Sequence, residues 1–291
     1  MQRVTGRYAH GVCYSSLAVY NSILQELPQF LDSSQGKHNN IDTYVLRKDF
    51  GRQESSLSEE KGQKRSRKNM YTIEELYDLD HTLAGDYLRQ FTYPWEALKG
   101  IKDFILQLGP TLDPEEYKEV SEHVWVHKSA NVFDSAYLGE ATIIGPNTEV
   151  RHCAFVRGAA LVGADCVVGN SVELKNVILF DHVQTPHYNY VGDSILGYYS
   201  HMGAGSITSN VKSDKKLVVI RDGEEKFETG IKKFGAMLGD HVEIGCNSVL
   251  NPGSIIGRAS RVYPTSCVRG VIPASSIWKV DGSIAQIREE N

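Results

Sequence analysis

The sequence predicts a mainly β protein: a parallel β-helix of hexapeptide repeats, with an inserted hairpin and a small helical segment before it. Large aliphatic residues recur every six positions from Val126 to Leu174, and again from Leu238 to Val268. Small or β-branched residues stand two positions before most of them. A six-residue repeat is typical of a β-helix in which each hexad forms one strand and turn, so that about eighteen hexads make about six triangular coils.

Residues 1–69 differ in composition from the rest of the 291-residue chain. Between Arg47 and Lys68 the sequence is polar and highly charged, without an apolar period. Such a stretch cannot bury enough apolar surface to offset its ordering entropy. Two interpretations stay open: residues 1–69 are a disordered tail, or they are a translated upstream region and Met70 is the biological start.

Residues 70–123 are expected to form a helical N-terminal segment that caps the repeat. Thr72 and Glu75 have the spacing of a capping box at the start of a helix. Apolar residues then keep the i, i+3, i+4 spacing of one helix face, at Leu98, Ile101, Phe104, Ile105 and Leu108. Asp113 and Pro114 predict the start of a further short helix.

The β-helix is expected over residues 124–275, with a C-terminal tail at 276–291. Two stretches break the six-residue period, Asp181–Tyr190 and the insertion 211–234. Within the insertion an Asp-Gly pair stands between two apolar runs and predicts a hairpin turn. Loops on a rigid scaffold often carry function, so both stretches are candidate site regions.

The composition excludes several classes of protein. The net charge of −5 argues against a nucleic-acid binder, and the 41% hydrophobic content is that of an ordinary globular chain. No apolar run is long enough for a transmembrane helix, and the N-terminus has no secretory signal. Five cysteines without a C-x-x-C pair exclude a disulfide scaffold and fit a reducing cytoplasm. We therefore expect a cytoplasmic protein without nucleic-acid or membrane partners.

Several motifs then resemble one family. They are His187-Tyr-Asn-Tyr190-Val-Gly-Asp193-Ser, Gly203-Ala-Gly205, Asn210, and the segment GIKKFGAMLGDHVEIG after the hairpin. With the hexads, they resemble the left-handed β-helix acyltransferases over residues 124–275. The resemblance is closer to the C-terminal domain of the bifunctional glucosamine-1-phosphate acetyltransferase/N-acetylglucosamine-1-phosphate uridyltransferase and of archaeal sugar-1-phosphate nucleotidylyltransferases. The nucleotidyltransferase domain has no counterpart in residues 1–120.

The resemblance implies a single-stranded left-handed β-helix that transfers an acetyl group from acetyl-CoA to an amino-sugar 1-phosphate, in nucleotide-sugar biosynthesis. It also implies direct attack by the amine without a metal, and a homotrimer with sites between subunits. His187 alone is only a histidine in a loop that breaks the period. Its imidazole suits proton transfer near neutral pH, and the family uses this position as the base.

Five further residues are candidate substrate contacts. The resemblance implies that Tyr190 and Asn210 contact the sugar phosphate, although a packed aromatic ring and a turn asparagine are the alternatives. Arg157 and Lys175 lie eighteen residues apart, so they should stack on one edge of the prism. Two stacked cations repel each other unless an anion lies beside them, which favours a phosphate or nucleotide diphosphate site over solvated surface charges. Lys216, at the hairpin base, is a mobile point charge for the same anion.

Other positions depart from the family pattern. His201 and Cys246 stand where the bacterial enzymes usually carry Asn and Ser, and Tyr263 and Pro264 replace two small residues in the last coils. These changes lie toward the acyl donor. Cys246 and Tyr263 are therefore candidate contacts to acetyl-CoA.

Two other functions stay open. One is a sugar-phosphate-binding or assembly module that has lost acyl transfer. The other is a zinc enzyme similar to the γ-class carbonic anhydrases, with His152, His182 and His187 as metal ligands. The broken hexads around His187 do not match the regular register of that class.

Overall fold

The computed structural model describes residues 70–287. The two interpretations of residues 1–69 concern residues outside this range, as do the last four residues of the predicted C-terminal tail. None of the helices in this range is long and apolar enough to cross a membrane.

The N-terminal segment begins with short helices, as predicted. They are α1 (Ile73–Leu76), η2 (Leu79–His81), α2 (Gly85–Leu88), η3 (Pro94–Lys99), α3 (Ile101–Leu108) and η4 (Gly109–Thr111). The capping box is confirmed: the Thr72 backbone N–H donates to the Glu75 carboxylate at 2.8 Å, and the Glu75 N–H donates to the Thr72 hydroxyl at 3.3 Å. The helix predicted from Asp113 is wrong. Asp113 forms one turn and the chain continues as strand β1 (Tyr117–Ser121), antiparallel to β2.

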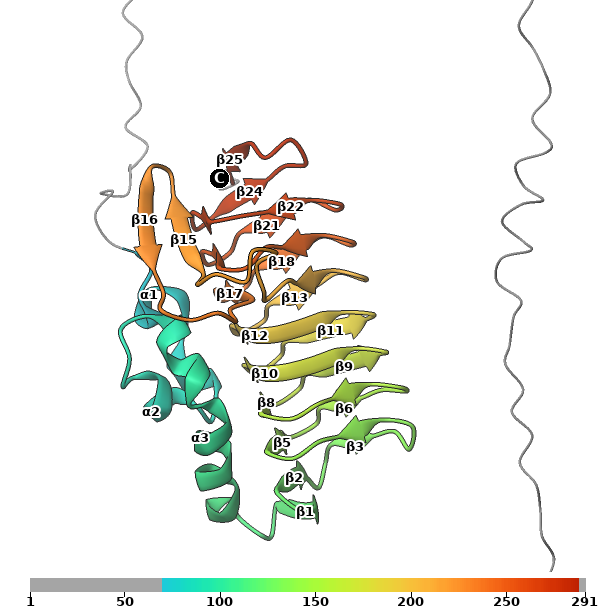
Figure 1. Cartoon of the computed structure of the whole chain (residues 1–291). Helices are drawn as coiled ribbons and strands as arrows, with labels where there is room; N and C mark the ends of the chain where they lie inside the picture. The colour runs from blue at the N-terminus through green and yellow to red at the C-terminus, as the bar shows by residue number, and fades with distance from the viewer. Residues whose placement is uncertain (1–69, 288–291) are drawn as a thin grey trace, which may run out of the picture. The chain divides into compact units, whose positions relative to one another are not determined.

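The rest of the chain is a β-solenoid with three faces (Figure 1). The first face stacks β2 (Val124–His127), β5 (Thr142–Ile144), β8 (Ala160–Val162), the second half of β10 (Glu173–Leu179), the second half of β12 (Tyr190–Leu196), β17 (Ala236–Leu238), β20 (Ser254–Ile256) and β23 (Val271–Ile272). The second stacks β3 (Asn131–Val132), β6 (Glu149–Val150), β9 (Val167–Asn170), β11 (Gln184–His187), β13 (His201–Met202), β18 (Glu243–Ile244), β21 (Arg261–Val262) and β24 (Ser276–Trp278). The third stacks β4 (Tyr137–Leu138), β7 (Phe155–Val156), the first halves of β10 and β12, β14 (Ile207–Thr208), β19 (Val249–Leu250) and β22 (Cys267–Val268).

The predicted repeat is confirmed, but the solenoid is longer than predicted. It has about nine turns, where the aliphatic count gave about six. The count missed hexads with a polar or aromatic residue at the interior position, such as Thr185, which is fully buried between Val168 and the next coil. Residues 276–278 belong to the solenoid as β24 and pair with the antiparallel strand β25 (Ile284–Gln286), so the predicted tail is ordered at its start.

The stretch Asp181–Tyr190 does not interrupt the solenoid. Two successive coils have 17 residues instead of 18, from Val162 to Leu179 and from Leu179 to Leu196, so Leu179, not the predicted Phe180, pairs with both of these residues. The six-residue register shifts by one residue between Leu174 and Leu179 and by one more between Val191 and Leu196, which is why the period looks broken in the sequence. Phe180 instead lies just outside the strand and packs on Tyr77 with ring centroids 5.1 Å apart.

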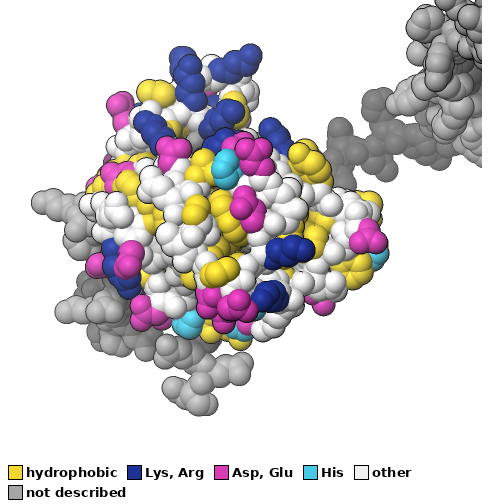
Figure 2. Space-filling model, turned by 90° about the horizontal axis from the view of Figure 1, so that it is seen from below, with side chains coloured by type: hydrophobic (Ala, Val, Ile, Leu, Met, Phe, Trp, Pro, Cys, Tyr) yellow, Lys and Arg dark blue, Asp and Glu magenta, His cyan; other side chains and the backbone are white. Residues whose placement is uncertain are grey.

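The helical segment covers the first face of the solenoid (Figure 1). The strands of this face carry apolar residues at their outward positions as well, and Ile143, Ile178 and Ile195 are fully buried. Two hydrogen bonds fix the contact, from the Tyr77 hydroxyl to the Ile195 carbonyl and from the Asn176 side chain to the Leu98 carbonyl. The segment therefore caps this face, as predicted. Seen from the β1 end, acidic and basic side chains are interspersed on the surface (Figure 2).

The predicted hairpin consists of β15 (Val219–Asp222) and β16 (Glu225–Glu228). Its turn is one residue later than predicted, because Asp222 pairs with Glu225. Val218 and Ile220 are buried, so the hairpin is docked and does not project as a free arm. Gly270 (φ +82°) allows this close approach, since a Cβ there would lie 2.5 Å from the Arg221 carbonyl oxygen.

Candidate functional site

A buried carboxylate organises the corner where the third face meets the first. Asp193 is 3% exposed and has the left-handed φ of 49°, which Asp tolerates better than most residues. One of its oxygens accepts from Lys175 Nζ at 2.8 Å and from Asn176 Nδ2 at 2.9 Å. The other accepts from Asn210 Nδ2. Lys175 reaches it because β10 places that residue beside Gly192 in the next coil.

Tyr190 completes this group, which we call the Asp193 cluster: Asp193, Lys175, Asn176, Asn210 and Tyr190. The Tyr190 hydroxyl accepts a hydrogen bond from Asn210 Nδ2 at 3.1 Å. Its ring lies over Gly192, where any Cβ would be 2.4 Å from the Tyr190 oxygen. Burial, and then the charges of Asp193 and Glu173, raise the pKa of Tyr190, so the hydroxyl keeps its proton near neutral pH.

Arg157 and Lys175 are neighbours, as the sequence predicts: the Arg157 N–H donates to the Leu174 carbonyl at 2.8 Å. The two cations do not need an external anion, however, contrary to the prediction. Arg157 pairs with Glu173 at 2.7 Å and Lys175 pairs with Asp193 at 2.8 Å. Each cation already has a carboxylate from an adjacent position. Their stacking therefore gives no independent support for a phosphate site.

His187 lies at the end of β11, on the corner between the second and third faces, and is exposed. Its backbone is fixed: its carbonyl accepts from the Gly205 N–H at 3.0 Å, and its N–H donates to the Asn189 side chain at 3.2 Å. Within residues 70–287, no hydrogen bond, ion pair or aromatic stacking joins its ring to another side chain. His187 thus precedes the short strand 190–192 of the Asp193 cluster, with Tyr190 at the start of the strand and Asp193 directly after its end.

Cys246 and Tyr263 lie toward the same corner as His187. Backbone hydrogen bonds connect the corner from coil to coil, from Gly205 to His187, from Asn247 to Ala204 and from Thr265 to Cys246. Both predicted acyl-donor residues are exposed there. His201, the other departure from the family pattern, bonds Glu243 through Nδ1 at 2.8 Å.

Lys216 is not brought to the Asp193 cluster. It is exposed in the loop before β15, and only its backbone N–H has a hydrogen bond within the described range, to Asp214 at 3.0 Å. Of the predicted contacts, the structure therefore joins Lys175, Tyr190 and Asn210, places Arg157 beside them, and leaves His187 and Lys216 apart.

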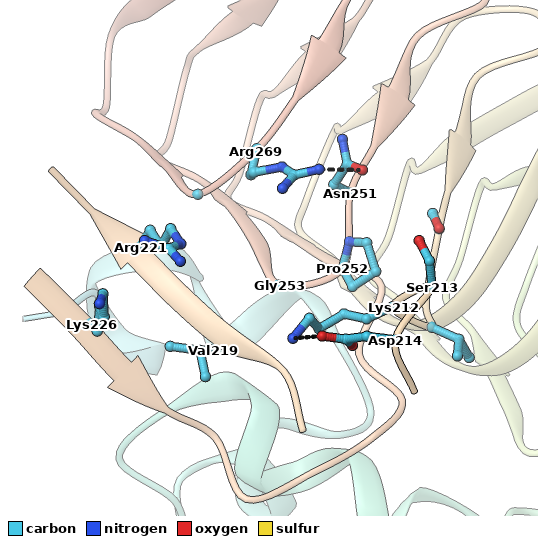
Figure 3. A pocket seen from close by; sticks show the side chains of 13 residues that line it. Lys212, Ser213, Asp214, Val219, Arg221, Lys226, Asn251, Pro252, Gly253 and Arg269 are labelled. Atoms are coloured by element: carbon cyan, nitrogen blue, oxygen red, sulfur yellow. Dashed lines mark hydrogen bonds and ion pairs between the residues drawn. The ribbon is translucent and has the colours of Figure 1, made fainter. Parts of the chain in front are cut away.

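Sequence reasoning missed two features. The first is the role of Asp193, which belongs to the His187–Ser194 motif but was given no function from the sequence. Its position directly after Gly192, at a corner of the solenoid, could have indicated that role. The second is a cavity of about 570 Å³ between the hairpin and the solenoid. Its lining includes four basic side chains, from Lys212, Arg221, Lys226 and Arg269 (Figure 3). No sequence signal places these residues together, because they come from a loop, a hairpin and a later coil.

The zinc hypothesis finds no support within one chain. Residues 70–287 contain no group of three or more His, Cys, Asp or Glu side chains placed to hold a metal ion. His182 stacks on Tyr199 with ring centroids 4.4 Å apart, on a different corner from His187. His152 packs on Phe133.

Comparisons with known proteins agree with the resemblance seen in the motifs. No family model matches the sequence. The chain is 28% identical over 166 residues to a bifunctional sugar-1-phosphate nucleotidylyltransferase/acetyltransferase of Sulfurisphaera tokodaii, covering 57% of this chain and 41% of that protein. It is 26% identical over 224 residues to the bifunctional protein GlmU of Methanococcus vannielii, covering 76% and 53%. The chain thus spans roughly half the length of these relatives.

The comparison with solved structures matches AntD, an N-acyltransferase from Bacillus cereus in complex with dTDP and 3-hydroxybutyryl-CoA. It shares 16% identity and a TM-score of 0.33, covering 63% of this chain and 88% of AntD. PerB from Caulobacter crescentus, in complex with CoA and GDP-perosamine, shares 15% identity and a TM-score of 0.28, covering 64% and 67%. The fold is that of the hexapeptide-repeat β-helix proteins. Within that class, this chain resembles the C-terminal regions of GlmU and of the sugar-1-phosphate nucleotidylyltransferase/acetyltransferases.

Proposed function

We propose that this chain is a CoA-dependent sugar acyltransferase that N-acetylates an amino-sugar 1-phosphate or a sugar nucleotide. The observation that carries the proposal is the arrangement along strand 190–192. An exposed imidazole, His187, precedes this strand, and Asp193, which anchors the polar cluster that includes the neutral Tyr190 hydroxyl, follows it. Sequence similarity to a bifunctional nucleotidylyltransferase/acetyltransferase supports the same class of reaction.

In the proposed reaction the sugar amine attacks the thioester carbonyl of acetyl-CoA. The C–N bond forms, the C–S bond breaks, and the proton of the amine passes to His187. His187 then returns this proton to the departing CoA thiolate, so its charge is restored at the end of the cycle. The high pKa of Tyr190 leaves its hydroxyl a hydrogen-bond donor, so His187 is the better base.

The remaining residues have binding roles in this proposal. Tyr190, Asn210 and Lys175 orient the sugar phosphate, and Arg157, whose side chain is 47% exposed, is free to turn from Glu173 toward it. Lys216 contributes a mobile positive charge. Cys246 and Tyr263, on the corner of His187, contact acetyl-CoA.

We further propose a homotrimer. His187 precedes strand 190–192 and Asp193 follows it, and no hydrogen bond or ion pair joins the two side chains in the described part of the chain. A second subunit packed along this strand would enclose the substrate between them. Exclusion of water strengthens the polar contacts that hold it.

The test is to incubate the full chain with acetyl-CoA and a panel of amino-sugar 1-phosphates and nucleotide amino sugars, and to follow the products by mass. We expect one acetylated product, and a drop in kcat of about 100-fold or more in His187→Ala. His241→Ala is the matched control, since His241 is also exposed at a corner but stacks on Tyr199 away from strand 190–192.

Two results would contradict the proposal. Full turnover in His187→Ala would remove His187 as the base. Absence of product from every amine, with sugar phosphate bound and CoA not bound, would favour a binding module that has lost acyl transfer.

A further inference from the structure

We propose that the cavity between the hairpin and the solenoid is a binding site for the diphosphate of a nucleotide. We call it the hairpin cavity and define its basic residues as Lys212, Arg221, Lys226 and Arg269. The proposal relies on the acyltransferase function only for the source of the ligand; binding itself does not require that function.

The charges of the hairpin are the first support. Arg221 and Lys226 stand directly opposite each other on β15 and β16. Like charges at such positions repel and destabilise a hairpin. Neither has a carboxylate partner among residues 70–287. An anion held between them would remove the repulsion.

Two of the three carboxylates in the paired positions of the hairpin lie on the face opposite Arg221 and Lys226. Side chains alternate along a strand, so Asp222 and Glu225, which pair with each other, point away from the face that carries Arg221 and Lys226. The basic face lines the cavity. The third carboxylate, Glu228, pairs with Val219 and is on the same face as Lys226, but it does not line the cavity.

The solenoid supplies the other wall. Arg269 projects from the end of β22, and its contact in the described range is a 3.5 Å hydrogen bond to Asn251, which leaves most of its guanidinium donors available (Figure 3). Lys212 is partly neutralised by Asp214 at 3.3 Å. Two guanidinium groups and two ammonium groups around one space match the paired phosphates of a diphosphate, because Arg binds phosphate oxygens in a bidentate manner.

The size and polarity of the cavity favour a nucleotide over a free diphosphate. Its volume of about 570 Å³ is within the range of small-molecule sites. Ser209, Ser213 and Asn251 add polar groups to the lining that suit a ribose or a base. Ser209 also precedes Asn210, so the cavity begins next to the Asp193 cluster.

The cavity is preformed. Val218 and Ile220, at the start of the hairpin, are buried against the solenoid near Gly253, and Gly270 brings the Arg221 backbone against the solenoid. The basic side chains therefore project from fixed backbone positions on two walls. A site organised before binding loses less conformational freedom when the ligand enters.

Two sources share this chemistry: the nucleoside diphosphate of a sugar nucleotide and the adenosine phosphates of CoA. The test is isothermal titration of the full chain with UDP, with CoA, with adenosine 3′,5′-bisphosphate and with inorganic pyrophosphate. We expect at least one nucleotide to bind. We also expect Arg221→Gln and Arg269→Gln each to weaken that binding by about 10-fold or more, and added salt to weaken it further.

Lys232→Gln is the matched control, since Lys232 is an exposed cation of the same insertion that does not line the cavity. Lys226→Gln tests the same cavity without a risk of misfolding, because Lys226 is exposed and its loss removes no buried contact. Tighter binding of UDP supports a sugar nucleotide as the ligand, and tighter binding of CoA and the bisphosphate supports the acyl donor.

The proposal is overturned if the wild-type chain binds none of the four probes, or if Arg221→Gln and Arg269→Gln both bind as tightly as wild type. Its failure is distinguishable from failure of the proposed function. Nucleotide binding without acetyl transfer refutes only the acyltransferase, and acetyl transfer with no loss of affinity in the variants refutes only the hairpin cavity.

Discussion

The Asp193 cluster and the hairpin cavity are two neighbouring basic regions. They differ in whether their cations are paired with carboxylates. In the Asp193 cluster, Lys175 is paired with a carboxylate whose side chain is only 4% exposed. In the hairpin cavity, Arg221 and Lys226 face each other without a carboxylate partner in the described range. The number of cations in a sequence segment therefore does not reveal where positive charge is available for a ligand.

The difference follows from burial. A carboxylate removed from water must be paired and hydrogen-bonded, and three donors satisfy Asp193. The side chains of the hairpin remain in contact with solvent, which hydrates unpaired cations at little cost. A ligand that displaces this water gains the interaction with charges that the protein has left uncompensated.

The largest expected effect on stability comes from removing the Asp193 carboxylate, which is at the centre of the Asp193 cluster. Asp193→Ala deletes the acceptor of Lys175, Asn176 and Asn210, and should lower the free energy of unfolding by about 2–4 kcal/mol, somewhat below the range for a fully buried pair because Lys175 is 25% exposed. Urea unfolding followed by circular dichroism measures this. Asp193→Asn keeps a residue that tolerates the left-handed φ and should lose less.

Glu149→Gln is the control for this variant. Glu149 pairs with Arg151 at 2.8 Å, but both side chains are more than a third exposed, so the loss should be under about 1 kcal/mol. Equal losses in Asp193→Ala and Glu149→Gln would mean that the Asp193 cluster contributes no more than a surface ion pair.

Much of the fold could be predicted from the sequence, because the interior of a β-helix accepts one aliphatic residue per hexad. The predictions failed where that relation fails. Thr185 fills an interior position with a polar side chain, and a coil shortened by one residue moved Leu179 into the place predicted for Phe180. The strand β1 was missed because its side chains are mostly exposed and leave no apolar pattern.

The candidate site was predicted only in part. The eighteen-residue spacing correctly placed Arg157 beside Lys175, since it equals one coil. The ion pair between Lys175 and Asp193 was not predictable. It forms across a corner of the solenoid, and the geometry of that corner depends on the shortened coil. The hairpin cavity brings together residues as distant as Lys212 and Arg269, and no spacing rule connects them.

An intermediate effect is expected where the hairpin meets the solenoid. Gly270→Ala places a Cβ 2.5 Å from the Arg221 carbonyl oxygen and forces a left-handed φ on Ala. We expect a loss of about 1–2 kcal/mol in the free energy of unfolding. Hydrogen exchange of the β15 and β16 amides should become faster, with the solenoid strands unchanged.

Gly223→Asn is the matched control for that substitution. Gly223 has a φ of +59°, which Asn tolerates, and a Cβ there would meet nothing within 4 Å. Its stability should stay close to that of wild type. If Gly270→Ala exchanged its hairpin amides no faster than Gly223→Asn, the hairpin would not depend on close contact at Gly270, and the cavity would not be preformed.

The smallest expected effect is an increase in stability. Lys226→Gln removes the repulsion with Arg221 and should stabilise the ligand-free protein by about 0.2–1 kcal/mol. Thermal melts at low and high salt measure this, and the gain should shrink at high salt because exposed charges are screened. Lys232→Gln should give no such gain, since Lys232 lies outside the β15–β16 pairing. If Lys226→Gln instead destabilised the ligand-free protein at low salt, the two cations would not be in conflict. Lys226→Gln should therefore be more stable without ligand and bind the nucleotide more weakly. Both effects are expected if the unpaired cations lower stability but contribute to ligand binding.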